Sequence, residues 1–416
     1  MSQPGMRSLR GMAGAEWLDW PQTRAVFAAL GAGAEVRAVG GAVRNTLLGR
    51  PVTEVDLATP AAPDSVMRLA TSAGLKTVAT GLDHGTVTVI VDGVPFEVTT
   101  LRKDVETYGR HAKVAFTDDW EADARRRDFT INALYADGEG TLHDPLGGLA
   151  DIASRRIRFI GDARARIRED FLRILRFFRL NAEYGAPPYE AEGLAACVAE
   201  RKGLERLSPE RVHKEVDRML VADGALAALE AMFDYGLLTD VLASVPYLSR
   251  LRRLNVLERA LGREPNAILR LAALAVAVPE DADRLRERLR LSNAEHARLA
   301  AAGALTPHRA PASEDAARAA LYRSGAETYR DRVLLAWADT GAGSDDPKWR
   351  GLYALPEDWR TPVFPLRGQD LIERGWPKGP AIGELLKRIE ADWVAGGFKG
   401  DRAALLAAAE RTRTRA

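Results

Sequence analysis

The division of this chain into a strand-rich part and a helix-rich part is the feature that most limits its possible folds. Short runs that are β-branched or alternating, and bounded by glycine or proline, lie mostly between residues 35 and 144. Such runs are typical of β-strands. After about Asp151, Ala, Leu, Arg and Glu predominate and apolar residues recur at helical spacing. The pattern predicts an α/β head with a small mixed sheet, followed by an all-α remainder.

Four predicted strands can be located in the head, at residues 36–40, 54–59, 85–93 and 94–101. The pair Asp92-Gly93 separates the last two, and an Asp-Gly pair favours a two-residue hairpin turn because both residues tolerate positive φ. In the later part, one apolar stripe with helical spacing consists of Phe171, Leu172, Leu175, Phe178 and Leu180. The spacing predicts that this segment is a helix with one buried face.

The chain has 416 residues, which is enough for about two to four domains. Proline-rich breaks at 186–188, 307–311 and 361–365 suggest boundaries inside the helical part. We divide the chain into three regions, at residues 1–150, 151–245 and 246–416.

Charge and cysteine content exclude several classes of protein. Lys and Arg number 59 and Asp and Glu 58, for a formal charge of +1, so a uniformly basic nucleic-acid coat is excluded while local basic stripes are not. Cys197 is the only cysteine, which excludes an intrachain disulfide framework and a Cys-based zinc cluster and fits a reducing cytoplasm. Residues 1–16 have Arg7 and Arg10 but no apolar h-region after them, and no run of 18 apolar residues occurs anywhere, so we expect neither secretion nor a membrane span.

The segment VGGAVRNTLLGRPVTEVDLAT begins with a strand and a Gly40-Gly41 turn, continues as a short helix, and ends in a second strand with Glu54 and Asp56. Alternation along a strand would place both carboxylates on one face. Two adjacent like charges are costly unless a cation lies between them, and oxygen ligands suit Mg²⁺. For E-x-D alone, a solvated strand face is the simpler explanation. The glycine turn favours a functional site, because it lets backbone N–H groups approach a phosphate closely.

Two arginines of the same segment, Arg44 and Arg50, would add donors for a phosphate. A third carboxylate should come from a neighbouring strand, and Glu97 is the candidate, since Asp92 and Asp104 lie in turn or loop contexts. The alternative for Glu97 is an exposed strand position without a metal role.

Residues 101–123 carry charges of both signs and have no clear period. A loop of this length inside a compact domain is usually functional or disordered. Its candidate substrate-contacting residues are Arg102, Asp104, Tyr108, Arg110 and His111.

Arg126, Arg127 and Asp128 then open an apolar run. They form either a surface ion-pair cluster or a site in which the arginines hold a triphosphate and the aspartate accepts from a ribose hydroxyl.

The ordered set of motifs from about residue 36 to 220 resembles the bacterial class II tRNA nucleotidyltransferases, or CCA-adding enzymes, a family shared with bacterial poly(A) polymerases. The matching segments are GGAVRNTLLGR with EVDLAT, the loop at 101–123, RRDFTINAL, DPLGGLADI, EDFLRILRFFRLNA and LSPERVHKEVDRML. The final third matches more loosely, through PLRGQDLIERGWPKGPAIGELL. The resemblance implies a polymerase-β-like head with helical neck, body and tail, in which regions after the head bind tRNA.

The resemblance also implies an activity: addition of CMP, CMP and AMP to a tRNA 3′ end from CTP and ATP, with Mg²⁺ as cofactor and the protein as template. The implied metal ligands are Glu54 and Asp56, with Glu97 as the third catalytic carboxylate. The implied nucleotide-binding residues are Gly40, Gly41, Arg44, Arg126, Arg127, Asp128, Asn132, Glu169, Asp170, Arg173, Arg176 and Arg179. We infer no stable protein partner.

The E-D-x-x-R motif has a chemistry that suits base selection. On one helix, Asp170 and Arg173 would share a face and Glu169 would support Arg173. Cytosine and adenine each present an amine donor beside a ring-nitrogen acceptor, which matches a carboxylate beside a guanidinium. Uracil and guanine reverse that pattern, at a cost of about 1–3 kcal/mol per unsatisfied group. The alternative is a plain helix salt bridge.

Basic residues are concentrated beyond the head. Residues 155–179 hold nine arginines against three acidic residues, and we expect many of them to face phosphate. Two further basic clusters are Arg201, Lys202, Arg206, Arg211, His213, Lys214 and Arg218, and then Arg250, Arg252 and Arg253. These clusters fit the acceptor and T arms of tRNA, and solvated helix faces explain them nearly as well.

Two positions depart from the family pattern. Glu54 stands where the family usually has Asp, and Asn45 stands where it often has Asp. The substitution at 54 motivates one rival, an inactive tRNA-binding protein. The other rivals are a poly(A) polymerase and a partial CC-adding or A-adding enzyme on the same fold. The segment TGLDHGTVTVIV, which lacks a basic stretch, and the full-length loop at 101–123 favour complete CCA addition.

Overall fold

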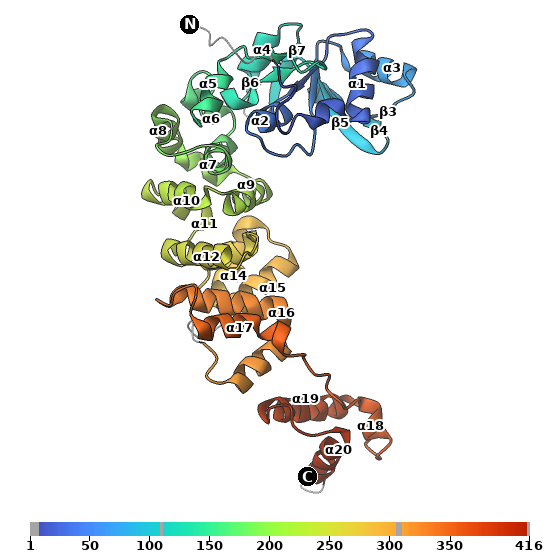
Figure 1. Ribbon diagram of the computed structural model, residues 1–416, viewed down its shortest axis with the longest axis vertical. Helices are drawn as coiled ribbons and strands as arrows, with labels where there is room; N and C mark the ends of the chain where they lie inside the picture. The colour runs from blue at the N-terminus through green and yellow to red at the C-terminus, as the bar shows by residue number, and fades with distance from the viewer. Residues whose placement is uncertain (1–7, 109–110, 305–309, 414–416) are drawn as a thin grey trace. The chain divides into compact units, whose positions relative to one another are not determined.

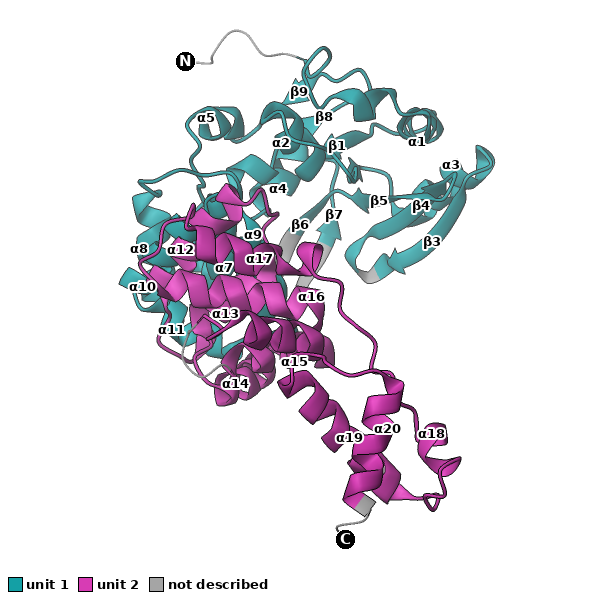
Figure 2. Cartoon of the chain, turned by 60° about the horizontal axis from the view of Figure 1, so that its bottom comes forward, with its two compact units in different colours: residues 1–241 teal, residues 242–416 magenta. Residues whose placement is uncertain are grey.

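The computed structural model describes residues 8–108, 111–304 and 310–413, apart from the side chains of residues 83, 104–114 and 413. It divides into two compact units, Met1–Val241 and Leu242–Ala416 (Figure 2).

Unit 1 contains a seven-stranded mixed sheet with the order β3-β4-β5-β2-β1-β8-β9 (Figure 1). The strands are β1 (Arg37–Val39), β2 (Leu57–Thr59), β3 (Lys76–Gly81), β4 (Thr86–Val91), β5 (Val94–Thr100), β8 (Tyr135–Ala136) and β9 (Leu142–His143). Only the β2–β5 pair is parallel. The predicted mixed sheet is confirmed, and the Asp92-Gly93 turn has the expected backbone, with φ of 50° and 82°.

The predicted strand at 54–59 is wrong in its first half. Regular strand structure begins at Leu57, so Glu54 and Asp56 lie in the segment that leads into β2. The alternation of exposure nevertheless persists in that segment, because Val55 is buried between the exposed Glu54 and the partly buried Asp56.

Two helices, α1 (Pro21–Gly31) and α3 (Pro63–Ser72), pack together and against β4. Their buried side chains join those of β4 and β5, such as Phe96 and Val98, in one hydrophobic core. Because successive strand residues point to opposite faces, Glu97 lies on the face of β5 away from this core, and it is exposed.

Residues 101–123 are not the irregular loop that the sequence indicated. They form an antiparallel hairpin of β6 (Arg102–Tyr108) and β7 (His111–Phe116), a two-stranded sheet of its own, followed by α4 (Trp120–Arg125). The mixed charges concealed the strand pattern, since they occupy positions that a buried strand would fill with apolar residues.

The other helices of unit 1 are α2 (Gly41–Leu47), α5 (Gly148–Ala153), α6 (Ala163–Glu169), α7 (Leu172–Glu183), α8 (Ala191–Ala199), α9 (Pro209–Val221), α10 (Ala225–Asp234) and α11 (Leu237–Leu242). The described residues of unit 1 also include four 3₁₀ helices, η1 (Glu16–Asp19), η2 (Leu82–His84), η3 (Thr130–Asn132) and η4 (Arg201–Arg206). Helix α7 packs against α9 and α10, and the predicted helix is confirmed. The prediction of a single buried face is wrong, because residues 177–182 are all buried and lie on every side of the helix. The expected single helix through Glu169, Asp170 and Arg173 is wrong, because Asp170 has extended backbone (φ −151°, ψ 107°) and separates α6 from α7.

Unit 2 is helical throughout its described residues. Its helices are α12 (Leu248–Ala260), α13 (Ala267–Ala275), α14 (Pro279–Leu289), α15 (Asn293–Gly303), α16 (Glu314–Asp339), α17 (Pro347–Asp358), α18 (Gly368–Ile372), α19 (Pro380–Ala395) and α20 (Arg402–Arg413). Helix α16 is kinked at Gly325, which has φ of 74°. The predicted strand-rich head and helical remainder are therefore confirmed.

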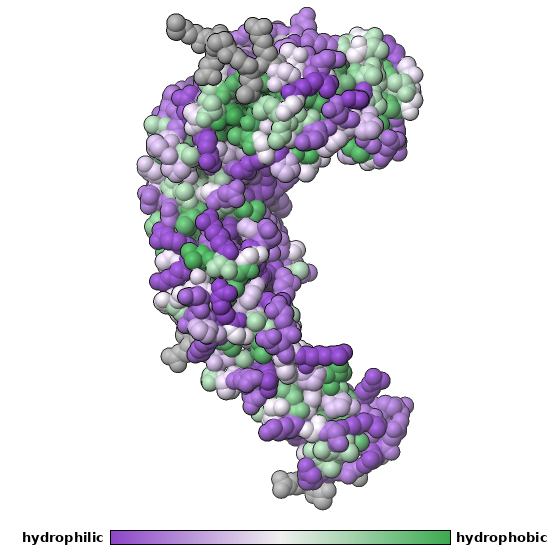
Figure 3. Space-filling view, viewed as in Figure 1, coloured by the Kyte–Doolittle hydropathy of each residue, from purple (hydrophilic) through white to green (hydrophobic). Residues whose placement is uncertain are grey.

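The surface shown in Figure 3 is largely hydrophilic, with hydrophobic residues in small groups among the polar ones. Among the described residues, none of the helices combines the length and the hydropathy that crossing a bilayer requires.

Candidate active site

The glycine turn links the sheet to a short helix. Gly40 follows β1 with φ of +70° and ψ of −108°, a backbone conformation that side chains rarely adopt, and Gly41 begins α2. The Gly40 N–H donates to the carbonyl of Leu134 at 3.0 Å. The turn is thereby fixed against the segment that leads into β8.

Three carboxylates come together beside this turn. The parallel register pairs Leu57 of β2 with Val98 of β5, so one residue earlier Asp56 lies beside Glu97. The Val39 N–H donates to the carbonyl of Asp56 at 2.9 Å and fixes its backbone on the other side. Burial, and the negative charges of Glu54 and Glu97, raise the pKa of Asp56 to about 6, against the opposing charge of Arg127.

The chemistry of this cluster fits a divalent cation. Burial is the largest cause of the raised pKa of Asp56, and the charges of Glu54 and Glu97 add to it. A positive ion would offset the repulsion among the three carboxylates, and carboxylate oxygens are the ligands that Mg²⁺ prefers.

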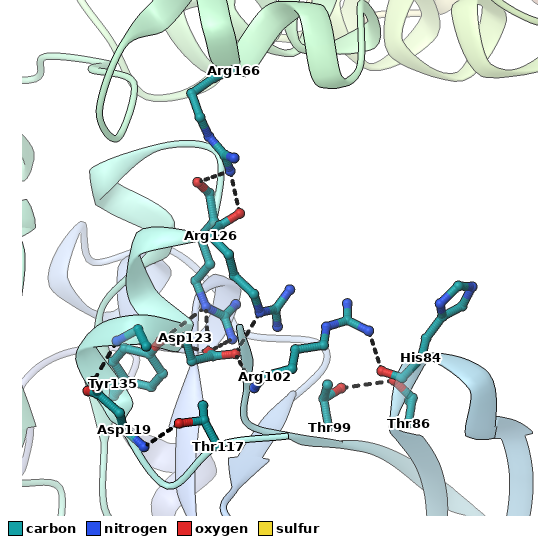
Figure 4. A network of polar contacts seen from close by, with 12 residues as sticks. His84, Thr86, Thr99, Arg102, Thr117, Asp119, Asp123, Arg126, Tyr135 and Arg166 are labelled. Carbon is teal, nitrogen blue, oxygen red and sulfur yellow. Dashed lines mark hydrogen bonds and ion pairs between the residues drawn. The ribbon is translucent and has the colours of Figure 1, made fainter. Parts of the chain in front are cut away.

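Asp123, which the sequence analysis did not select, organises the two adjacent arginines (Figure 4). Its carboxylate is 1% exposed and accepts from Arg126 Nε at 2.8 Å, from Arg127 Nη2 at 3.0 Å and from the Tyr135 hydroxyl at 2.9 Å. The backbone N–H of Arg102 also donates to it, at 3.4 Å. Burial opposes ionisation of Asp123, but Arg127 and Arg126 outweigh it and lower its pKa.

Asp128 and Asn132 form a second polar group. Asp128 accepts from Asn132 Nδ2 at 3.0 Å and from the Phe129 N–H at 2.9 Å, and it pairs with Arg176 of α7 at 2.6 Å. Burial opposes ionisation of this carboxyl too, but Arg176 and Asn132 overcome it and lower the pKa of Asp128. Asn132 also accepts from Arg44.

Arg44 and Arg179 are largely buried. Arg44 lies over the ring of Tyr184 at 4.2 Å and donates to its hydroxyl at 3.0 Å, and burial lowers the pKa of its guanidinium. Arg179 is held between Glu183, at 2.6 Å, and Glu215. Both guanidinium groups therefore bond to protein groups of unit 1 in this structure, and their expected role toward a nucleotide stays a prediction.

The E-D-x-x-R residues meet across a helix junction. Arg173 of α7 donates through Nη1 to the Glu169 carboxylate and to the carbonyl of Arg166, the latter at 2.6 Å. The expected Glu169–Arg173 contact is therefore present although the helix is broken. Asp170 accepts two hydrogen bonds from Arg211 of α9, at 2.5 and 3.3 Å. All three motif residues keep part of their surface exposed.

The hairpin residues are described only in part. The Arg102 side chain donates to the carbonyl of His84 (Figure 4). Asp104, Tyr108 and His111 lie on the paired strands, where their side chains fall outside the described atoms, and Arg110 falls outside the described residues.

One of the basic clusters is corrected by the structure. Arg250 is 5% exposed and donates to the carbonyls of Ala272, Ala273 and Val276. It is a structural residue of unit 2 and presents no charge to a nucleic acid.

Tyr184 was not predicted from the sequence, and Arg166 and Arg211 were predicted only as members of basic clusters that face phosphate or tRNA. The link of Asp123 to its arginines was detectable, because the residues are three and four apart in a helical segment. The partners of Tyr184 and Arg211 are distant in sequence and gave no local signal.

Comparison with known proteins agrees with this geometry. The family model described as "Poly A polymerase head domain" matches residues 36–158, and that described as "Probable RNA and SrmB- binding site of polymerase A" matches residues 190–251. The mouse mitochondrial CCA tRNA nucleotidyltransferase 1 is 33% identical, over 91% of this chain and 87% of that protein. The CCA-adding enzyme of Geobacillus stearothermophilus is 34% identical, over 91% and 93%. A crystal structure of the Bacillus stearothermophilus CCA-adding enzyme in complex with CTP superposes with a TM-score of 0.71 at 29% identity, covering 95% of this chain and 99% of that one. The resemblance drawn from the motifs is confirmed, and the chain belongs to the family of CCA-adding tRNA nucleotidyltransferases.

Proposed function

We infer that this protein adds the CCA sequence to the 3′ end of tRNA from CTP and ATP, releasing pyrophosphate. The observation that carries this conclusion is similarity over about nine tenths of the chain to proteins named CCA-adding enzymes, in mouse and in bacteria. In each cycle the 3′-oxygen of the RNA bonds to the α-phosphorus of the nucleotide. The bond from that phosphorus to the bridging oxygen breaks, and pyrophosphate leaves.

We assign Glu54, Asp56 and Glu97 to the reacting centre, as ligands of Mg²⁺. When bound, the ion would promote ionisation of the attacking hydroxyl and neutralise charge on the α-phosphate and the leaving group. The raised pKa of Asp56 supports this role, since burial and, after it, the charges of Glu54 and Glu97 disfavour its ionised form when no cation is present.

Arg126 and Arg127 are the proposed triphosphate ligands. Each uses part of its guanidinium to bind Asp123 and so has a fixed orientation, which favours the recognition of phosphate oxygens by their other N–H groups. We propose that Asp128 accepts a hydrogen bond from a ribose hydroxyl of the nucleotide. Gly40 and Gly41 are proposed to let the backbone N–H groups approach the phosphates closely. Asn132 and Arg176 are proposed to hold Asp128 in place, and Arg44 to hold Asn132. Arg179, which bonds to Glu183 and Glu215, is proposed to stabilise the helices behind the site.

Asp170 and Arg173 are the proposed readers of the base edge, with Glu169 holding Arg173. Arg173 contacts protein groups through Nη1, so we assign Nη2 to the ring-nitrogen acceptor of cytosine or adenine. Asp170 would accept a hydrogen bond from the exocyclic amine of the base while it keeps its hydrogen bonds from Arg211. We propose that the hairpin residues Arg102, Asp104, Tyr108, Arg110 and His111 adapt the site to adenine after two cytosines.

We further propose that the regions at 151–245 and 246–416 bind the acceptor and T arms of tRNA, and that the protein acts in the cytoplasm. The single cysteine, Cys197, which is buried and free, supports a reducing compartment.

The test is incorporation of labelled CTP and ATP into tRNA that lacks its 3′ CCA. We expect two C residues and one A, in that order, and then no further growth. Long A tracts would indicate a poly(A) polymerase, products ending at CC or beginning only at A would indicate a partial enzyme, and tRNA binding without incorporation would indicate an inactive binder.

A further inference from the structure

Arg166 of α6 connects two parts of the site that are far apart in sequence. It is 8% exposed, and its guanidinium divides between two groups of acceptors. One nitrogen, Nη1, pairs with the Glu169 carboxylate. The other, Nη2, donates to the backbone carbonyls of Arg126 and Arg127, at 2.7 Å to the second. Figure 4 shows this side chain reaching from its helix to the backbone at Arg126.

The contacts on the α6 side lead directly to the base-reading residues. Glu169 also accepts from Arg173, and Arg173 donates to the backbone carbonyl of Arg166 itself at 2.6 Å. The side chain and the backbone of Arg166 are therefore both bonded within the turn that carries Arg173.

The contacts on the other side lead to the triphosphate arginines. Arg166 fixes the carbonyls of Arg126 and Arg127, while Asp123 fixes their guanidinium groups. Backbone and side chain of these two residues are thus restrained from opposite directions. A displacement of either carbonyl would change the hydrogen bonds of Arg166 and, through Glu169, the position of Arg173.

A guanidinium is suited to this arrangement. Its donors lie in a rigid planar fork, so it can hold a carboxylate at one nitrogen and carbonyls at the other. A lysine ammonium keeps the charge, but it is a point on a flexible stem and cannot hold both sets in one fixed geometry. Replacement by lysine therefore removes the connection while largely preserving the electrostatics.

We propose that Arg166 is a positioning residue that couples the triphosphate subsite to base selection. This inference rests on the proposed function. Because Arg166 acts through Glu169 and through the backbone at 126–127, it lets occupation of the triphosphate subsite hold Arg173 in its base-reading position. Arg166 then affects both the binding of a triphosphate group, which itself contains no base, and the discrimination between bases.

The first experiment compares Arg166→Lys with the wild type in two assays. One is single-turnover incorporation of CTP and UTP into tRNA that lacks CCA. The other is competitive inhibition of CTP incorporation by inorganic tripolyphosphate, which cannot contact the base-reading residues. We expect the C-over-U ratio to fall about tenfold and the inhibition constant of tripolyphosphate to rise about tenfold, as for loss of a charge-assisted hydrogen bond.

Two variants serve as comparisons. Arg24→Lys changes the same residue type in α1, where Arg24 is 63% exposed and pairs with Asp19 at 2.5 Å, and neither readout should change. Glu169→Gln should reduce the C-over-U ratio and leave the inhibition constant of tripolyphosphate unchanged. If Arg166→Lys changes only the C-over-U ratio, or neither quantity, the coupling is refuted.

A measurement on the unmodified protein covers the case in which Arg166→Lys does not fold. Tripolyphosphate should slow amide hydrogen exchange in residues 167–173 and leave α10 unaffected. Unchanged exchange in 167–173 at saturating tripolyphosphate would overturn the proposal. Failure of the proposed function itself would be seen separately, as absence of CCA addition by the wild type and by Arg24→Lys.

Discussion

Replacing Asp123 with asparagine tests the arrangement of the triphosphate arginines most directly. The wild-type carboxylate is 1% exposed and is the common partner of Arg126, Arg127 and the Tyr135 hydroxyl. Asparagine has nearly the same shape and keeps one oxygen acceptor. The change therefore removes a buried negative charge with little change in packing.

The expected loss of stability follows from the burial of the partners. Breaking a buried ion pair by removing one member costs about 3–5 kcal/mol, mainly because the other charge stays buried. Arg126 and Arg127 keep 15% and 19% of their side-chain surface, so water compensates in part. We expect the free energy of unfolding of the head to fall by about 3 kcal/mol. The KM for CTP and for ATP should rise about tenfold together, because both nucleotides present the same triphosphate.

Native-state hydrogen exchange of amides in β4 and β5 measures the stability of the head by itself. Asp119→Asn is a matched control, because Asp119 is the exposed N-cap of α4 and asparagine caps a helix equally well. A loss below about 1 kcal/mol for Asp123→Asn, or a change in KM for only one nucleotide, would refute the reasoning.

The stabilisation by Asp123 also has a defined pH dependence. The pKa of Asp123 is lowered in the folded protein from its ordinary value of 3.8, so its contribution is fully present above that value and is lost as the pH falls through the lowered pKa. In urea unfolding at a series of pH values, the difference between wild type and Asp123→Asn should be constant near neutrality and become smaller below pH 3.8. A difference that grew on acidification would contradict the sign.

Further predictions concern the remaining parts of the site. Asp56→Ala should cut incorporation of both nucleotides by about 10²–10³ while tRNA binding, followed by filter retention, is nearly unchanged; near-normal incorporation would exclude it as a metal ligand. Arg173→Ala should reduce the single-turnover preference for CTP over UTP by about tenfold or more, whereas an unchanged ratio would leave it a helix-junction ion pair. Shortening residues 105–112 should yield products that stop at CC, and equal loss of C and A addition would point to a folding role. Arg179→Met should lower the unfolding free energy by about 3 kcal/mol with little change in the KM for CTP; a raised KM at unchanged stability would assign Arg179 to the nucleotide after all.

Local sequence patterns predicted the parts of the fold that depend on local physics. The Asp92-Gly93 turn follows from the preference of both residues for positive φ, and the presence of helix α7 follows from the helical spacing of its apolar residues. The hairpin of β6 and β7 was missed because its strands form a separate two-stranded sheet. Charged residues of both signs are distributed along residues 102–116, so the alternation of apolar and polar residues that identifies a strand is weak there.

The placement of the arginines could not be predicted from the sequence, because an arginine on a helix has the same local pattern whether it faces solvent or a buried carboxylate. Arg44 and Arg179 are such cases: their partners Tyr184 and Glu215 are supplied by tertiary packing. The break at Asp170 was missed for a related reason. Its cause is the pair of hydrogen bonds from Arg211, 41 residues later, together with a side-chain cap to the Leu172 N–H.

The glutamate at position 54 is compatible with this site because the two acidic positions before β2 are not equivalent. Asp56 is partly buried, and its backbone carbonyl accepts a hydrogen bond from Val39 of β1. The pKa of its carboxyl is raised to about 6. Glu54 is exposed, and it is anchored by its buried neighbour Val55. A longer side chain at an exposed position can adjust its rotamers to reach a common ion at small cost, whereas a longer side chain at the constrained position would displace its neighbours. The geometry therefore accommodates glutamate at position 54 more readily than it would at position 56.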